Sequence, residues 1–204
     1  INDNNVDYYP LMQPYLPPKK GDISVKKGDW MFYNQTIQTT INGKLKEKEV
    51  IYFNCSIINV DDSTILLKVK LYKNGTENIL QYREEIREEG NASGIIVPAN
   101  LSDHDVVRLC WYSHNLRNIP LNGTRKTMYA ASLREVCFIS HQQRFVNQES
   151  NLSICVNVFY CWDKLTGILC ESSWAIHTEN STLSTELSYT TRIWKTNLWK
   201  ENES

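Results

Sequence analysis

The sequence predicts an all-β protein, arranged as a disulfide-stapled antiparallel β-sandwich that is immunoglobulin-like or related. Asn42, Asn74 and Asn122 are each followed by glycine, and Asn-Gly is typical of two-residue hairpin turns because both residues tolerate a positive φ. Runs of β-branched and aromatic residues lie between these turns, and six cysteines are available to join strands. Short helical turns could form only in 81–90 and 128–136.

Residues 1–29 are expected to form an extended arm rich in proline and tyrosine. Pro10, Pro14, Pro17 and Pro18 rule out a regular helix or a central strand there. The arm covers the core as a strap, forms a disordered leader, or binds a partner through its tyrosines.

Residues 30–125 are expected to form a first β domain. Trp30 begins a strand that should reach Thr40 and return through the turn at Asn42. The run 65–72 alternates leucine or valine with lysine, which indicates one buried and one solvated face. The charged run 83–89 is expected to be an edge strand or a loop.

Residues 126–204 are expected to form a second β region that packs on the first, unless the two make one continuous domain. Strands are predicted at 136–139, 153–162 and 168–176, with a looser final strand in 184–198. In the strand 153–162 one face should carry the side chains of Ile154, Val156, Val158 and Tyr160, and the other those of Cys155, Asn157, Phe159 and Cys161. The turn 163–167 then brings Cys161 close to Cys170.

Two features indicate a mature secreted protein or the ectodomain of a membrane protein, with its signal peptide removed. The first is nine Asn-X-Ser/Thr sequons among 20 asparagines, where chance would give roughly three. The sequon asparagines are Asn34, Asn54, Asn74, Asn91, Asn100, Asn122, Asn151, Asn180 and Asn202. The second is the even number of cysteines, which suits three disulfides and no free thiol. We expect most sequons to carry glycans, except Asn54, which an early-folding strand around Cys55 could mask.

The stretch 49–112 resembles an immunoglobulin-type domain. Cys55 corresponds to the strand B cysteine, and Cys110 to the strand F cysteine. Two positions depart from that pattern, because Leu71 stands where the core tryptophan is expected and Arg108 where the corner tyrosine is expected. The resemblance implies a disulfide between Cys55 and Cys110. Three pairings of the other four cysteines then remain; the hairpin favours Cys161 with Cys170, which leaves Cys137 with Cys155.

Two further resemblances concern function. A tryptophan near a strand start, a cysteine-bearing strand and then Tyr72-Lys73-Asn74-Gly75-Thr76 resemble the lipocalins of blood-feeding ticks, which enclose a small ligand. Dense sequons and frequent Asn, Ile and Lys resemble the secreted and envelope glycoproteins of large DNA viruses. That second resemblance implies a viral protein that engages a receptor or evades immunity.

Several function classes find no support in the sequence. There is no Gly-X-Ser-X-Gly elbow, no glycine-rich phosphate loop and no Cys-X-X-Cys pair, so we expect no enzyme, no cofactor and no metal site. The net charge of −1 argues against nucleic-acid binding. Apolar stretches shorter than ten residues predict no membrane span.

The remaining class is binding. Six tryptophans and 11 tyrosines exceed what one core needs, and surplus aromatic side chains are common interface anchors. The predicted partner-binding residues are Trp111, Tyr112 and Trp162. The sequence therefore predicts a glycoprotein that sequesters a host protein (a receptor, cytokine or other immune ligand), with a partner subunit also possible. The alternative is a lipocalin-like carrier of a small ligand.

Overall fold

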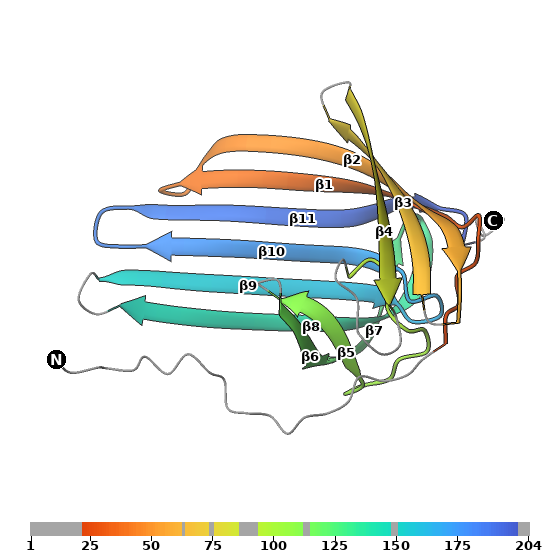
Figure 1. The fold of residues 1–204 in the computed structure, drawn as a ribbon. Helices are drawn as coiled ribbons and strands as arrows, with labels where there is room; N and C mark the ends of the chain where they lie inside the picture. Colours follow the sequence, from red (N-terminus) through yellow and green to blue (C-terminus); the bar gives the residue numbers. More distant parts are fainter. Residues whose placement is uncertain are drawn as a thin grey trace.

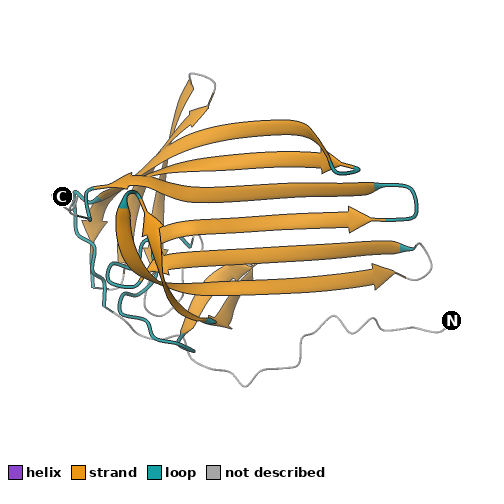
Figure 2. Cartoon of the chain, turned by 180° about the vertical axis from the view of Figure 1, so that it is seen from behind, coloured by secondary structure: helices purple, strands orange, loops and turns teal. Residues whose placement is uncertain are grey.

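The fold was analysed in a computed structural model, which describes residues 22–62, 64–73, 76–85, 94–111, 115–147 and 151–199. Eleven strands and no helix make up this part of the chain (Figure 2). The strands are β1 (Trp30–Ile41), β2 (Lys44–Val60), β3 (Thr64–Lys73), β4 (Thr76–Glu85), β5 (Val106–Trp111), β6 (Asn115–Pro120), β7 (Gly123–Tyr129), β8 (Ser132–Asn147), β9 (Leu152–Asp163), β10 (Leu169–Glu179) and β11 (Ser184–Thr196).

Nine of these strands form one antiparallel sheet in the order β4-β3-β2-β1-β11-β10-β9-β8-β7. Neighbours in the sheet are neighbours in the chain, except where β1 pairs with β11. β5 and β6 form a separate two-stranded ribbon. In Figure 1 the long strands run side by side, while β3 and β4 cross their ends steeply at one side of the molecule.

The predicted all-β, antiparallel fold is confirmed. The β5–β6 ribbon contributes Val107 and Leu109 to the same core as the main sheet, so the molecule has two β layers at this end. The strand order among the described residues is not that of an immunoglobulin domain, because the strands before and after residue 125 belong to one sheet. The predicted boundary at 125/126 falls inside β7.

The hairpin turns were predicted with mixed success. Asn42 and Gly43 have φ values of 50° and 71° and join β1 to β2, as predicted. Lys73 pairs with Thr76, and the two residues between them, the predicted second turn, lie outside the described residues. The predicted third turn is wrong. Asn122 instead runs beside β8, donating its backbone N–H to the Phe138 carbonyl at 2.9 Å and accepting the Ser140 N–H at 2.6 Å.

The segment 128–136 is a hairpin and not a helix. Its turn uses Ala130 and Ala131, with φ values of 45° and 62°, so no Asn-Gly pair signals it. The final predicted strand is confirmed as β11, and the described part of the charged run 83–89 lies in the edge strand β4.

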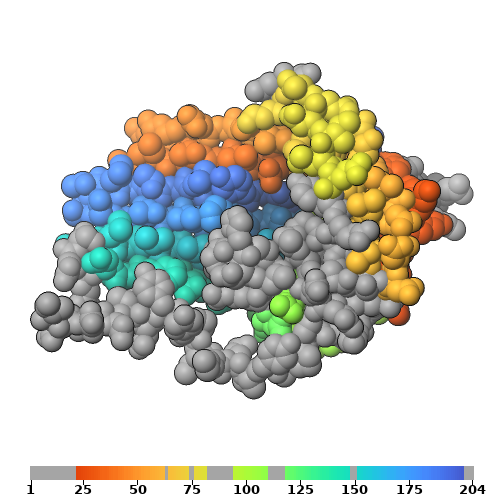
Figure 3. All heavy atoms as spheres, in the orientation of Figure 1, coloured from red at the N-terminus to blue at the C-terminus, as the bar shows by residue number. Residues whose placement is uncertain are grey.

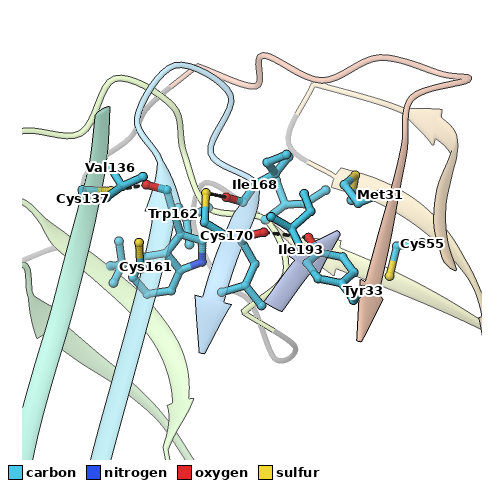
Figure 4. Packing of buried hydrophobic residues seen from close by; sticks show 14 of the residues in the cluster. Met31, Tyr33, Cys55, Val136, Cys137, Cys161, Trp162, Ile168, Cys170 and Ile193 are labelled. Atoms are coloured by element: carbon cyan, nitrogen blue, oxygen red, sulfur yellow. Dashed lines mark hydrogen bonds between the residues drawn. The ribbon is translucent and has the colours of Figure 1, made fainter. Parts of the chain in front are cut away.

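The hydrophobic core occupies one end of the sheet. Figure 4 shows Met31, Tyr33 and Cys55 from β1 and β2 near Ile193, with Trp162 and Cys170 farther along the same cluster. Met31, Tyr33, Cys55 and Trp162 are all fully buried. Toward the opposite end of the sheet most side chains of β1, β10 and β11 are only half-buried.

The β9–β10 turn is organised by a buried ion pair. Asp163 has no exposed side-chain surface and accepts two hydrogen bonds from the Arg134 guanidinium, at 2.8 and 3.0 Å. The same carboxylate accepts the backbone N–H and the hydroxyl of Thr166, at 3.0 and 2.6 Å. The Arg134 guanidinium also lies 5.1 Å from the centre of the Trp199 ring. The pair therefore joins β8, the turn and the C-terminal segment.

The other side of this turn receives the segment 94–101. Val97 donates its N–H to the Gly167 carbonyl at 2.9 Å, and Leu169 donates to the Ile95 carbonyl at 2.8 Å. Gly167 has a φ of 73°, and a Cβ atom on it would lie 2.0 Å from the Val97 carbonyl oxygen. Only glycine allows these two backbones to lie this close.

We predict that Gly167→Ala destabilises the protein much more than Gly43→Ala does. Both glycines have a φ near +70°, but a Cβ on Gly43 meets no atom within 4 Å. Gly43→Ala should therefore lower the free energy of unfolding by only about 1–2 kcal/mol, the cost of the left-handed backbone. Gly167→Ala adds a clash with a backbone carbonyl and should cost at least about 3 kcal/mol. Urea unfolding followed by tryptophan fluorescence measures both, and equal losses would contradict the assigned contact.

Candidate functional site

The side chains of strand β9 alternate between the two faces of the sheet. The face toward the β5–β6 ribbon, here the inner face, carries Tyr160, whose ring lies 3.3 Å from a Cβ position built on Gly94. Phe159 faces the other way and lies under the Arg125 guanidinium, which is 5.1 Å from its ring centre. Because side chains alternate along a strand, Val156 and Val158 share the inner face with Tyr160, as the sequence predicted.

The strand register extends this apolar surface across two more strands. Val158 lies opposite Trp174, and Trp174 opposite Tyr189. One step along the strands, Val156 lies opposite Ile176, and Ile176 opposite Leu187. The rings of Trp174 and Tyr189 are 5.4 Å apart, in agreement with a shared face. We call these six residues, Val156, Val158, Trp174, Ile176, Leu187 and Tyr189, the apolar face.

On the reverse side of the same strands, the side chains between the two rows of the apolar face are small or polar. The residue between Trp174 and Ile176 is Ala175, and its register partners on β9 and β11 are Asn157 and Ser188. Asn157 is exposed. The apolar face is thus a property of one side of the sheet and not of these strands in general.

Polar residues on β2 and β8 border the apolar face. On one side Ile37 of β1 continues the apolar row, but its partner on β2 is Glu49. On the other side Val158 and Val156 are opposite His141 and Gln143 of β8. An apolar centre between polar rims suits a ligand that is apolar along most of its length.

A polar pair separates the apolar face from the buried core. Gln35 donates from Nε2 to the Thr191 hydroxyl at 3.1 Å, one register step from Ile37 and Tyr189 toward the core. Farther in, the Tyr33 hydroxyl donates to the Leu169 carbonyl at 2.9 Å. Gln35 is half-buried and can hydrogen-bond to the polar end of a ligand, whereas the apolar face offers only dispersion and hydrophobic contact.

The inner side that contains the apolar face is long enough for an extended hydrocarbon. From Ile154 to Tyr160 the inner side of β9 spans six residues, or roughly 20 Å, and four strands from β9 to β1 span about 14 Å. Figure 3 looks toward the side crossed by β3 and β4, with atoms of β10 and β11 visible at the left and β4 rising beside them. Trp174, Ile176, Leu187 and Tyr189 are half-buried, so their surfaces are partly accessible.

The described cysteines form no disulfide in this structure. Cys55, Cys137, Cys155, Cys161 and Cys170 are free thiols. Cys110 belongs to β5, but its side chain lies outside the described set, so the predicted Cys55–Cys110 bond is not shown.

One predicted pair does not fit the fold. Cys137 lies opposite Trp162, whereas Cys155 lies opposite Arg144, seven residues farther along β8. At about 3.4 Å per residue the two cysteines are more than 20 Å apart, and a disulfide needs a Cα separation below about 7 Å. The prediction that Cys137 pairs with Cys155 is therefore wrong, because the register of β8 and β9 was not visible in the sequence.

Cys161 and Cys170 are neighbours, as predicted, and are hydrogen-bonded to each other. The hydrogen bond from Cys170 holds the pKa of Cys161 below its usual value, and the Tyr129 hydroxyl 3.3 Å away adds to this effect. Burial raises the pKa of Cys170 well above its usual value. Cys161 is thus the thiol of this pair that ionises first.

The predicted partner-binding residues are only partly placed. Trp162 is fully buried, stacks on Tyr160 at 5.4 Å and donates its ring N–H to the Gly94 carbonyl at 2.8 Å. Trp162 therefore cannot anchor a partner, and that prediction is wrong; the alternation of β9 puts it on the core side. The Trp111 side chain and the whole of Tyr112 lie outside the described residues.

The sequons are distributed over strands and loops. Asn34 and Asn54 are half-buried within β1 and β2, whereas Asn100, Asn122, Asn151 and Asn180 are exposed. Asn74, Asn91 and Asn202 lie outside the described residues.

The described residues contain neither a metal-ligand cluster nor a membrane-spanning helix. No group of three or more His, Cys, Asp or Glu side chains could hold a metal ion within these ranges. Within the same part of the chain no helix has the length and apolar composition needed to cross a membrane.

Comparisons with known proteins give little further information. No protein-family model matches the chain, and no curated protein matches it. Among solved structures, the chain is similar to a conserved protein of unknown function with a hot dog fold from Alicyclobacillus acidocaldarius. The two chains are 7% identical, the match covers 82% of this chain and 80% of that one, and the TM-score is 0.18. A TM-score this low does not establish a shared fold.

We predict that Cys155 is the most reactive of the described thiols outside the Cys161–Cys170 pair. Burial raises the pKa of Cys55 and of Cys137 to about 12, so both stay protonated and inaccessible at pH 8. Cys155 is only half-buried, so a reagent can reach its Sγ, which accepts a hydrogen bond from Gln142 Nε2 at 3.2 Å. Timed alkylation of native protein at pH 8 with peptide mass spectrometry should modify Cys155 long before Cys55 or Cys137. In urea all three should react, and a peptide linking Cys137 to Cys155 would refute the register.

Proposed function

We propose that this protein is a carrier that binds an elongated apolar ligand, such as a fatty acid or the acyl chain of a lipid, on the inner side of its main sheet. The observation that supports this most directly is the row of large apolar side chains on the inner side of β9, β10 and β11, where the outer side carries small or polar ones at the same level. Val156, Trp174 and Leu187 represent the inner side, and Asn157, Ala175 and Ser188 the outer side. This is the small-ligand alternative drawn from the sequence, placed on an open sheet.

The expected affinity is moderate. A methylene group gains about 0.8 kcal/mol when it is fully buried, so one that loses half of its water contact gains about 0.4 kcal/mol. About 14 methylenes lying on the sheet then contribute roughly 5–6 kcal/mol, which corresponds to a Kd of about 0.1 mM before the polar end is counted. Hydrogen bonds from the polar end of the ligand to Gln35 would lower this Kd.

A protein partner has less support in the described residues. Of the three aromatic side chains expected to anchor a partner, Trp162 is buried, and those of Trp111 and Tyr112 are outside the described set. The described residues that line the inner side carry no charged group between the polar rims, which suits a hydrocarbon chain better than a typical protein surface.

The sequons and cysteines support a secreted location. We include in the proposal one disulfide, between Cys161 and Cys170, whose thiols share a hydrogen bond. The Cys161 thiolate attacks a disulfide of a secretory-pathway oxidoreductase to form a mixed disulfide. Cys170, losing its proton, then displaces that enzyme as its reduced dithiol, so the two electrons pass to the oxidoreductase. Closing this bond would fix β9 to β10 beside the turn that Asp163 organises.

We predict that Trp174→Glu weakens ligand binding at least tenfold, whereas Ala175→Glu leaves it within twofold. Both changes place one carboxylate on β10, but only the first puts it on the apolar face, where a charge must be desolvated beside the ligand. Binding is measured as radiolabelled oleic acid retained by delipidated protein, a readout that does not depend on Trp174. In the parent and in Ala175→Glu, quenching of tryptophan fluorescence by a dibrominated fatty acid reports whether the ligand lies near the apolar face. Circular dichroism of both variants confirms that they fold.

Two results would overturn this proposal. One is an equal loss of binding in the two variants, which would show that the ligand does not bind on the apolar face. The other is a parent protein that neither releases lipid on solvent extraction nor binds oleic acid. If that protein instead recovers a defined partner from serum or cell-surface extracts, the protein-binding function takes its place.

A further inference from the structure

The outer side of the sheet carries an exposed aromatic cluster near the core end. It consists of Phe32, Tyr52 and Trp194, whose ring centres are 6.2, 5.7 and 6.0 Å apart. Trp194 is 52% exposed and Tyr52 is 39% exposed. Three contacting aromatic rings on a polar surface leave apolar area in water, and such area commonly marks a binding surface.

Two sequon asparagines lie on the same side of the same two strands. Asn34 is directly opposite Tyr52, and Asn54 is directly opposite Phe32. Each asparagine therefore has one ring across the ladder, about 5 Å away between Cβ atoms, and another ring two residues before it on its own strand, about 7 Å away. The alternation of Tyr33 and Phe53 into the core fixes this arrangement, because their rings stack 5.0 Å apart on the other face.

We propose that the ring cluster packs against the first sugar of an N-linked glycan on Asn34. The inference rests on the proposed secreted location. The C–H bonds on one face of a pyranose carry partial positive charge and meet the negative face of an aromatic ring, while both apolar surfaces lose water. Phe32 and Tyr52 flank Asn34 on two sides, so a sugar attached there reaches them without a spacer.

The covalent step is the ordinary transfer of an oligosaccharide from a lipid-linked diphosphate donor. The bond between sugar C1 and the donor phosphate oxygen breaks, a bond forms between C1 and Nδ2 of Asn34, the amide loses one proton, and the lipid diphosphate leaves. Thr36 completes the sequon as a threonine hydroxyl two residues after Asn34.

Asn54 competes for the same rings. Its Cβ lies diagonally across from that of Asn34, roughly 7–8 Å away, which leaves too little room for two branched glycans. Its side-chain oxygen accepts the Ser56 hydroxyl at 2.9 Å. We therefore assign the glycan that contacts these rings to Asn34, and we expect Asn54 to be glycosylated mainly when Asn34 is not.

Asn180 provides a matched control within the chain. It precedes Ser181 and Thr182 in the loop between β10 and β11, and the residue two positions before it is Thr178, not an aromatic residue. Its side-chain oxygen accepts the backbone N–H groups of Thr182 and Leu183 at 3.0 and 2.8 Å. A glycan on Asn180 should thus be exposed to solvent and should contact no aromatic ring.

The test is a double-mutant cycle on protein from a eukaryotic secretory host, with all glycans trimmed to one sugar. The variants are Phe32→Ala, Asn34→Gln and both together, and the readout is the equilibrium constant for unfolding in urea. Asn34→Gln should raise this constant about fivefold with Phe32 present and less than twofold in the Phe32→Ala background. Tyr52→Ala replaces Phe32→Ala if the latter does not fold. Asn180→Gln should show no coupling to Phe32.

Glycopeptide mass spectrometry completes the test. We expect Asn34 to be modified in most parent molecules, and Asn54 to become modified in Asn34→Gln. An unmodified Asn34 beside a modified Asn180 overturns the proposal while leaving the secreted location intact. Absence of a glycan from both Asn34 and Asn180 overturns the glycan proposal and the secreted location together. Lipid binding is measured separately and does not depend on this result. A modified Asn34 without coupling to either ring, or one molecule carrying both Asn34 and Asn54 glycans, also overturns it.

Discussion

The ion pair between Asp163 and Arg134 is the interaction on which most of the fold depends. Asp163 is fully buried, so its charge must be compensated locally, and it is compensated by the fork of Arg134 and by two donors of Thr166. Removing either partner would leave a buried charge, which typically costs several kcal/mol. The turn held in this way presents the Gly167 carbonyl to Val97 and the Lys164 carbonyl to Asn100. The segment 94–101, which leads into β5, is thereby attached to the main sheet.

The sequence predicted those elements whose signals are local. The alternation predicted for residues 153–162 is confirmed at Tyr160 and Phe159, which face opposite sides of the sheet, because successive side chains of a strand point to opposite faces. The turn at Asn42 and Gly43 was correct for the same reason, since their positive φ values are a local requirement. The apolar face combines three such strands, but its existence depends on register, which alternation within one strand does not fix.

The errors share a physical cause, which is that the deciding partner lies far away in the chain. Trp162 was expected to bind a partner, yet the Gly94 carbonyl, 68 residues earlier in the chain, accepts its ring N–H and Trp162 belongs to the core. Cys137 and Cys155 were paired by elimination, although the register between β8 and β9 separates them by seven residues. The Ala130–Ala131 turn carries no glycine or asparagine signal, so its positive φ values are imposed by the strands on either side.

The pairing of β1 with β11 has a consequence for how the chain must assemble during synthesis. Every other neighbour in the main sheet follows directly along the chain, so β1–β4 and β7–β11 can each grow as a succession of hairpins. β1 meets its second neighbour only after about 150 more residues have been made, which takes on the order of 10–30 s at a ribosome. During that interval one edge of β1 is unpaired and open to wrong partners. Molecules that fail at this point would exchange β11 between two chains, so a swapped dimer is the misassembled form that this topology favours.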